Sequence, residues 1–194
     1  LLMKIYFLRH TTLDIEDNIF YGQTDVDVSS NFANEVSIIK KKFDEKSINL
    51  KKILVISSPL KRCVKLATAL QVPFTIDPRI KELDLGEWEM KLMSTIPEVE
   101  IKKWQENLME YKIPNGESNR DFLERLNEFL KDILKSEQDV LLVAHAGSIN
   151  GMISILTKEP FDKQVENYWE KIKHGSLTSI QINKKKVIIE YIGK

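Results

Sequence analysis

The sequence predicts an α/β fold with three layers (α/β/α), in which helices cover both faces of a largely parallel central sheet. Short, continuously apolar segments alternate along the chain with segments whose apolar residues recur at helical spacing. Strands that are apolar on both sides are typical of parallel sheets buried between two helical layers. We expect one domain over residues 1–194, an ordinary length for a single compact unit.

Six segments have the short, apolar character of strands: residues 4–8, 52–57, 72–76, 140–144, 177–182 and 186–191. The first four are separated by helical segments, as crossovers between parallel strands require. The last two are joined only by the polar Asn183-Lys184-Lys185, which predicts a hairpin near the C-terminus.

Five segments carry the pattern of helices: residues 30–46, 58–70, 98–111, 118–135 and 147–156. The second is expected to begin at Ser58-Pro59, because serine caps free backbone N–H groups and proline fits the first turn. Residues 113–116, with the sequence IPNG, separate the third helix from the fourth, because proline and glycine interrupt helices.

The composition argues against binding to nucleic acid or to an anionic membrane. The chain has 29 basic and 29 acidic residues, so no large field of one sign is available to attract nucleic acid or an anionic membrane. Its apolar runs are too short to span a bilayer. Cys63 is the only cysteine and no segment has the layout of a signal peptide, so we expect a reducing cytoplasm. The oligomeric state is left open, with a homodimer as one possibility.

Charged and titratable residues stand where the predicted strands end. Arg9 and His10 follow the first strand, His145 follows the strand over 140–144, and Arg62 lies in the first turn of the helix after the second strand. The carboxyl ends of parallel strands meet at one edge of a sheet, so these residues are expected to converge. Two arginines, two histidines and a helix N-terminus suit a dianion such as a phosphoryl group.

Each of these residues also has a simpler interpretation. The Arg-His pair could decorate a loop, and His145 could be a core histidine whose hydrogen bonds are satisfied. Arg62 stands at the positive end of a helix dipole, which disfavours a cation by up to ~1 kcal/mol. Its anionic partner is therefore either a carboxylate of the protein or a phosphate.

Five sequence segments occur in a fixed order: FLRHTT at 7–12, SSPLKRC at 57–63, KELDLGEWE at 81–89, GES at 116–118 and VAHAG at 143–147. Together they resemble the motifs of the histidine phosphatase superfamily, which includes the cofactor-dependent phosphoglycerate mutases. The match extends from Met3 to about Ile180, and five motifs in order are far more specific than any one of them.

One branch of that superfamily is similar in two further places. Thr11 follows His10 where the mutases have glycine, and residues 21–28 read YGQTDVDV. Both features resemble the α-ribazole phosphatases of cobalamin nucleotide-loop assembly. In contrast, Met90 stands where the family frequently has glycine. Through Thr11 and residues 21–28, the resemblance implies α-ribazole 5'-phosphate as the substrate. The alternatives are a phosphoglycerate mutase-like activity and a broad phosphatase for sugar and organic phosphates.

The resemblance also implies roles for five residues. His10 is the nucleophile that forms a phosphohistidine, and its other ring nitrogen donates to a backbone carbonyl. Arg9, Arg62 and, if it is protonated, His145 hold the phosphoryl oxygens. Glu82 protonates the leaving oxygen and later takes a proton from the attacking water. Neither a metal ion nor a cofactor is implied.

Other residues near the motifs are weaker candidates. Four are interpreted as substrate contacts: Tyr21, Gly22, Gln23 and Ala146. Five are interpreted as packing, structural or surface residues: Cys63, Glu87, Trp88, Glu89 and His174. For His174, a place at the border of the pocket is the alternative to a surface loop.

Other phosphate chemistries fit less well. A cysteine phosphatase needs an arginine six residues after its cysteine, where this chain has Ala69. The aspartates at 25 and 27 do not follow an apolar strand, as those of magnesium-dependent phosphatases do, and no Gly-Lys-Ser/Thr loop is present. A non-catalytic phosphoester-binding scaffold remains an alternative, although such a protein would be expected to lack His10 or Glu82.

Overall fold

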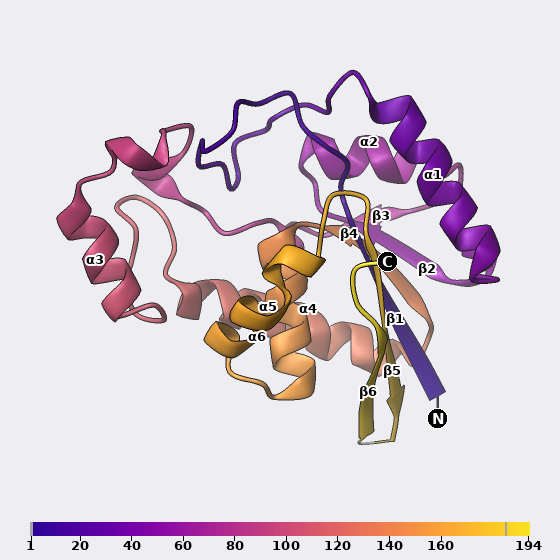
Figure 1. The fold of residues 1–194 in the computed structure, drawn as a ribbon. Helices are drawn as coiled ribbons and strands as arrows, with labels where there is room; N and C mark the ends of the chain where they lie inside the picture. The colour runs from indigo at the N-terminus through magenta and orange to yellow at the C-terminus, as the bar shows by residue number, and fades with distance from the viewer. Residues whose placement is uncertain (1, 185) are drawn as a thin grey trace.

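The computed structural model describes residues 2–184 and 186–194 and has helices on both faces of a central sheet (Figure 1). The six strands of this described part are β1 (Leu2–Arg9), β2 (Leu54–Ser57), β3 (Thr75–Ile76), β4 (Val140–Ala144), β5 (Leu177–Asn183) and β6 (Lys186–Tyr191). Their order in the sheet is β3-β2-β4-β1-β5-β6. The first four are mutually parallel, whereas β5 and β6 are antiparallel to their neighbours. The predicted three-layer α/β fold with a largely parallel sheet is confirmed.

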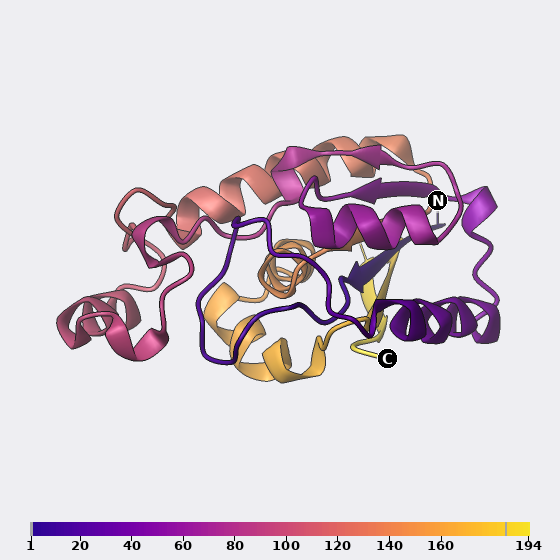
Figure 2. The same ribbon diagram turned by 90° about the horizontal axis from the view of Figure 1, so that it is seen from above.

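Two groups of helices flank this sheet (Figures 1 and 2). The helices are α1 (Phe32–Glu45), α2 (Lys61–Ala69), α3 (Glu98–Glu106), α4 (Asn119–Ser136), α5 (Ala146–Thr157) and α6 (Phe161–Tyr168). Buried residues of α1 and α2 share one apolar cluster with the sheet, and those of α4, α5 and α6 share another. Helix α3 lies apart from the sheet, at one end of the molecule (Figure 2).

Strand β1 shows how the sequence pattern builds these layers. Ile5 and Phe7 belong to the cluster under α4 and α5, while Tyr6 and Leu8 belong to the cluster under α1 and α2. Successive side chains of a strand point to opposite faces, so a continuously apolar strand is buried only where both faces are covered. Full burial of each such side chain contributes roughly 1.5–3 kcal/mol.

Helix α4 begins where the sequence predicts. Ser118 accepts a hydrogen bond from the Asp121 backbone N–H at 3.1 Å, and the Asp121 carboxylate accepts from the Ser118 N–H at 3.3 Å. This reciprocal capping satisfies two N–H groups that the helix itself leaves free.

Within the described residues, no helix combines the length and apolar character that crossing a bilayer requires.

Some predicted boundaries are wrong. Helix α2 begins at Lys61 with Leu60 as its N-cap, so Ser58 lies too early to cap it; the Ser58 hydroxyl accepts from the Leu60 N–H at 3.4 Å and contacts His145. The third helix ends at Glu106, since Asn107 leaves the helical conformation. Of the strand predicted over 72–76, only β3 (Thr75–Ile76) forms. Helix α6 has no counterpart among the predicted helices. Lys185 of the predicted hairpin connection lies outside the described residues.

A separate aromatic cluster supports the end of the molecule that carries α3. Trp88 is buried and stacks on Phe20 and Tyr111, while Trp104 of α3 meets its edge. The interpretation of Trp88 as a packing residue is confirmed. The cluster holds α3 beside the loop that follows β1, although α3 has no place in the sheet layers.

Candidate active site

His10 lies at the carboxyl end of β1, fully enclosed by protein. Its backbone N–H donates to the Ala144 carbonyl of β4 at 3.2 Å, and only 1% of the residue is exposed. Its ring Nδ1 lies 2.8 Å from the Thr11 carbonyl oxygen. A carbonyl only accepts, so Nδ1 carries the hydrogen and Nε2 keeps a free lone pair. The expected orientation of the ring by a backbone carbonyl is therefore present.

The residues expected to converge at this sheet edge do converge. The rings of His10 and His145 have centroids 5.4 Å apart, because β1 and β4 are adjacent parallel strands. Arg62, in the first turn of α2, donates from Nε to His145 Nδ1 at 3.3 Å and is fully buried. His145 Nε2 lies 2.8 Å from the Ser58 hydroxyl. Because Nδ1 accepts from a guanidinium, Nε2 carries the single ring hydrogen, and His145 is neutral here.

Burial and neighbouring cations keep both histidines uncharged. Burial, then the charges of Arg9 and Arg62, lower the pKa of His10 well below its usual value. Burial and Arg62 do the same to the pKa of His145. A neutral imidazole is what a nitrogen nucleophile requires, so the environment of His10 suits that role. A contact between His145 and the phosphoryl group was expected only for the protonated ring, and the ring is neutral in this structure.

Arg9 is held from behind by the segment that precedes β5. Its Nη1 donates to the Ile172 carbonyl at 2.8 Å, and its Nη2 lies 3.1 Å from His174 Nε2. The Arg9 Nε is buried without a partner among the described residues. These two contacts use two of the five N–H groups of Arg9, so further donors, Nε among them, remain for an anion.

His174 is part of the site, and its interpretation as a surface-loop histidine is wrong. Its ring centroid lies 5.4 Å from that of His10, and its Nε2 accepts from Arg9. Burial and the charge of Arg9 lower the pKa of His174 to about 4. No local sequence pattern marks this contact, because residues 10 and 174 meet only through the pairing of β1 with β5.

Glu82 reaches the same place from an extended segment outside the sheet. Its Oε2 accepts from the Gly147 N–H in the first turn of α5 at 2.9 Å, and its Oε1 accepts from the Leu83 N–H at 3.0 Å. A Cβ atom on Gly147 would stand 2.3 Å from Oε1. Only glycine at position 147 allows the carboxylate to lie against the helix N-terminus.

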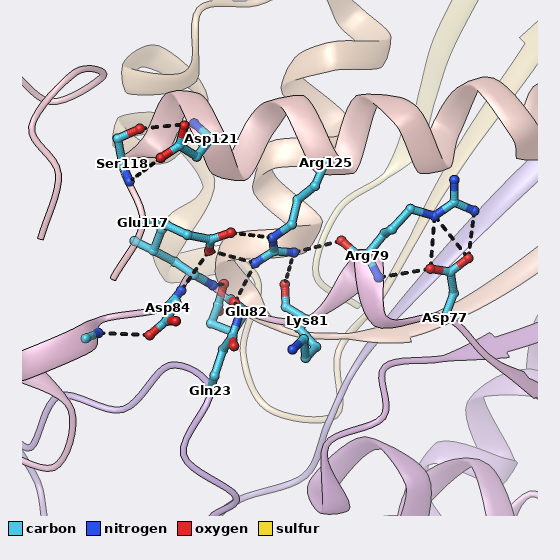
Figure 3. Close-up of polar contacts among 12 residues, drawn as sticks. Gln23, Asp77, Arg79, Lys81, Glu82, Asp84, Glu117, Ser118, Asp121 and Arg125 are labelled. Carbon is cyan, nitrogen blue, oxygen red and sulfur yellow. Dashed lines mark hydrogen bonds and ion pairs between the residues drawn. The ribbon is translucent and has the colours of Figure 1, made fainter. Parts of the chain in front are cut away.

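Arg125 of α4 holds the backbone that carries Glu82 (Figure 3). Its guanidinium donates to the carbonyls of Arg79, Lys81 and Glu82 at 2.7–2.8 Å and pairs with Glu117. The Glu117 carboxylate also accepts from the Asp84 N–H at 2.9 Å. The segment that carries Glu82 has no neighbouring strand to pair with. Arg125 of α4 and Glu117, which precedes that helix, therefore supply the hydrogen bonds to its backbone groups.

The turn at residues 21–24 closes over Arg62. The Gly22 and Thr24 carbonyls accept from its Nη2 and Nη1, and the ring of Tyr21 lies 5.3 Å from its guanidinium carbon. Glu89 fixes the turn by accepting from the Gly22 and Thr24 N–H groups at 2.8–2.9 Å. The structural interpretation of Glu89 is confirmed.

The four weaker substrate-contact candidates separate into two groups. Tyr21 and Ala146 line a cavity that opens beside His10. Gly22 and Gln23 do not line it: Gly22 contacts Arg62 through its carbonyl, and the Gln23 side chain donates to the Glu82 carbonyl at 3.1 Å. The structure places these two behind the site, where they fix the positions of other residues.

The cavity has a volume of about 430 Å³ and ends on Arg9, His10 and Glu82. That size is within the usual range for small-molecule sites. Arg62 and His145 lie behind these groups and do not line it.

Cys63 is not a reactive thiol, and the acidic residues that the structure describes do not form a metal site. Cys63 is buried in the apolar cluster of α1 and α2, and burial raises the pKa of its thiol to about 12. The thiol therefore stays protonated, as a packing residue does. In the described part of the chain, no group of three or more His, Cys, Asp or Glu side chains is placed to hold a metal ion.

Comparison with known proteins identifies the family. A model of the histidine phosphatase superfamily (branch 1) matches residues 5–193. A protein of Hydrogenobacter thermophilus named "Putative phosphoserine phosphatase 2" is 26% identical, covering 98% of this chain and 95% of the relative. The adenosylcobalamin/alpha-ribazole phosphatase of Escherichia coli is 24% identical, covering 94% and 92%. The crystal structure of the alpha-ribazole phosphatase from Shigella flexneri superposes with a TM-score of 0.83 at 22% identity, covering 99% and 96%. The chain belongs to the histidine phosphatase superfamily.

Proposed function

We propose that this protein hydrolyses a small-molecule phosphate monoester through a phosphohistidine formed on His10. The observation that carries the proposal is the state of the His10 ring. Its Nδ1 is committed to the Thr11 carbonyl, its pKa is held low, and its Nε2 lone pair is free at the floor of a cavity. A buried neutral imidazole of this kind is a nucleophile before any substrate arrives.

In the first step, His10 Nε2 attacks phosphorus while the bond from phosphorus to the alcohol oxygen breaks. Glu82, which lines the same cavity and enters this step as the protonated acid, gives its proton to the departing oxygen and is left as a carboxylate. In the second step, water attacks the phosphohistidine, Glu82 takes a proton from that water, and the phosphorus–nitrogen bond breaks. Inorganic phosphate leaves, and both side chains return to their starting protonation states.

Arginine donors offset the charge on the transferring group. Arg9 has a free Nε, and each terminal nitrogen of Arg62 has a second hydrogen beyond the one donated to the turn at 21–24. A bound dianion also favours the charged form of His145, whose Nδ1 would then give up its contact with the Arg62 Nε–H and donate instead. Loss of one such donor is expected to cost about 2.7–4 kcal/mol in the transition state.

The proposed substrate is α-ribazole 5'-phosphate. Thr11 and the segment 21–28 support this choice, as does similarity to two proteins named for that activity. The relative named for phosphoserine makes that ester the competing candidate, and a relative named as a phosphoglycerate mutase makes phosphoglycerate another. We further propose that turnover needs no metal ion, since the guanidinium groups supply the positive charge.

Two measurements test this proposal. Hydrolysis of 4-nitrophenyl phosphate in excess chelator should match that in untreated buffer, and loss of activity on chelation would contradict the metal-free mechanism. A panel of α-ribazole 5'-phosphate, phosphoserine, 3-phosphoglycerate and sugar phosphates, compared by kcat/KM, should rank the first highest. A scaffold without catalysis would bind these esters and hydrolyse none of them.

A further inference from the structure

The walls of the cavity are apolar, in contrast to its floor. Apart from the floor residues Arg9, His10 and Glu82, the lining includes Ile19, Phe20, Trp104, Phe161, Val165 and Trp169. Two polar side chains, Tyr21 and Asn119, are also present, and Asn119 donates one of its amide hydrogens to the Leu108 carbonyl at 2.9 Å. The cavity is thus built to hold a polar group at one end and an apolar group along its sides.

One wall comes from a single stripe of α6 and the residue that follows it. Phe161, Val165 and Trp169 are four residues apart, a spacing that places them on the same face of a helix. Phe161 is buried, but Trp169 is 43% exposed. An exposed tryptophan at the rim of an apolar cavity is a large flat surface available to a ligand.

Another part of the lining, Phe20 and Trp104, is made rigid by the aromatic cluster around Trp88. Phe20 stacks on Trp88 with ring centroids 5.8 Å apart, and Trp104 meets the edge of Trp88 at 5.6 Å. These contacts hold both side chains before a ligand binds. A preformed aromatic wall loses little conformational freedom on binding and favours a flat apolar group.

Among the residues that line the cavity, all of which lie in the described part of the chain, Arg9 is the only lysine or arginine. Arg9 stands at the phosphoryl end, beside His10. A second anionic group on the ester, such as a carboxylate, would therefore enter the apolar part without a cation to pair with. An unpaired charge in such surroundings is strongly disfavoured.

We infer that the enzyme is selective for phosphate esters whose alcohol half is uncharged and carries an aromatic ring, and that it discriminates against esters with a second anionic group. The inference rests on the proposed phosphatase function and narrows its substrate class. α-Ribazole 5'-phosphate, with its uncharged aromatic base, belongs to this class. Phosphoserine and phosphoglycerate, which carry a carboxylate, do not.

The test compares esters of matched size and leaving group. The carboxamide and the carboxylate of benzyl phosphate, substituted at the para position, differ only in the charge at the far end of the ring. The carboxylate is expected to have a kcat/KM at least about tenfold lower. Ethyl phosphate, which lacks the ring, is expected to fall roughly 10- to 100-fold below benzyl phosphate.

Two variants of cavity residues and one control variant locate the effect in the cavity. Val165→Lys places a cation in the α6 wall and should raise the carboxylate-to-carboxamide ratio of kcat/KM at least about fivefold. Ile38→Lys adds the same charge to an exposed position on α1, across the sheet, and should leave that ratio unchanged. Trp169→Ala, at an exposed rim position, should reduce the preference for benzyl over ethyl phosphate.

The outcomes separate the two proposals. Equal kcat/KM values for the carboxamide and the carboxylate, with turnover of both, would overturn the selectivity and leave the phosphatase function standing. A lower value for the carboxylate that Val165→Lys fails to change would overturn the assignment to this cavity. No turnover of any ester, with no phosphohistidine formed, would overturn the proposed function and this inference with it.

Discussion

Replacement of Gly147 by alanine should disable the proton transfer by Glu82 while leaving the fold intact. The added Cβ would stand 2.3 Å from Glu82 Oε1 and 2.9 Å from its Cδ, compared with an ordinary contact of 3.4 Å or more. The carboxylate must therefore retreat by about 1 Å. A displacement of that size costs on the order of 100-fold in rate, or about 2.7 kcal/mol.

The assay is the dependence of kcat/KM on the leaving group. An alkyl phosphate needs a proton on its departing oxygen, so kcat/KM for it should fall about 100-fold in Gly147→Ala. Dinitrophenolate is a leaving group that needs no proton, so kcat/KM for a dinitrophenyl ester should change less than about tenfold. The kcat for that ester should still fall, because hydrolysis of the phosphohistidine uses Glu82.

Gly151→Ala is the matched control, one turn further along α5. Its Cβ would meet Leu126 and Leu123 side chains and not Glu82, so it should alter stability without changing the leaving-group dependence. Alanine is the better helix former by about 1 kcal/mol, which partly offsets the crowding in both variants. If Gly147→Ala hydrolysed alkyl phosphates at the normal rate, Glu82 would not be the proton donor from this position.

Three further predictions concern stability. Arg125→Gln removes the partner of three backbone carbonyls and Glu117, and should lower the free energy of unfolding by about 2–4 kcal/mol in urea titrations. The control is Arg120→Gln on the same helix, which removes an exposed ion pair with Glu110 and should change that free energy little. Met90 has φ +62°, so Met90→Gly should raise the stability by about 0.5–1 kcal/mol, and a lower midpoint would contradict this. The pKa of His174 is lowered to about 4, so the unfolded chain binds a proton between pH 6.5 and 4 that the folded protein does not; stability should fall as pH is lowered through that range, and less steeply in His174→Gln.

The layers of the fold and the convergence of the main site residues were predictable because both depend on local pattern. Arg9, His10 and His145 stand at strand ends, and parallel strands bring their carboxyl ends to one edge whatever their order in the sheet. Met90 is a related case. The glycine that is frequent at this position in the family suits the left-handed backbone that this chain forms with a methionine.

The residues that position the site were not predictable from the sequence. Arg125 acts on Glu82 across 43 residues of sequence, through carbonyls that no pattern marks as lacking partners. His174 meets Arg9 only because β5 pairs with β1. The α6 wall of the cavity was missed because that helix is short and has few buried residues. Contacts between segments that are far apart in the sequence produce no periodic pattern of apolar residues.

The most direct test of the central claim is to trap the phosphoryl group on the enzyme. After rapid acid-free quenching of a reaction with a ³²P-labelled ester, the chain should carry acid-labile, base-stable label, and peptide mapping should place it on His10. His10→Ala should carry none and should lose turnover. Label on another residue, or full turnover by His10→Ala, would contradict the mechanism.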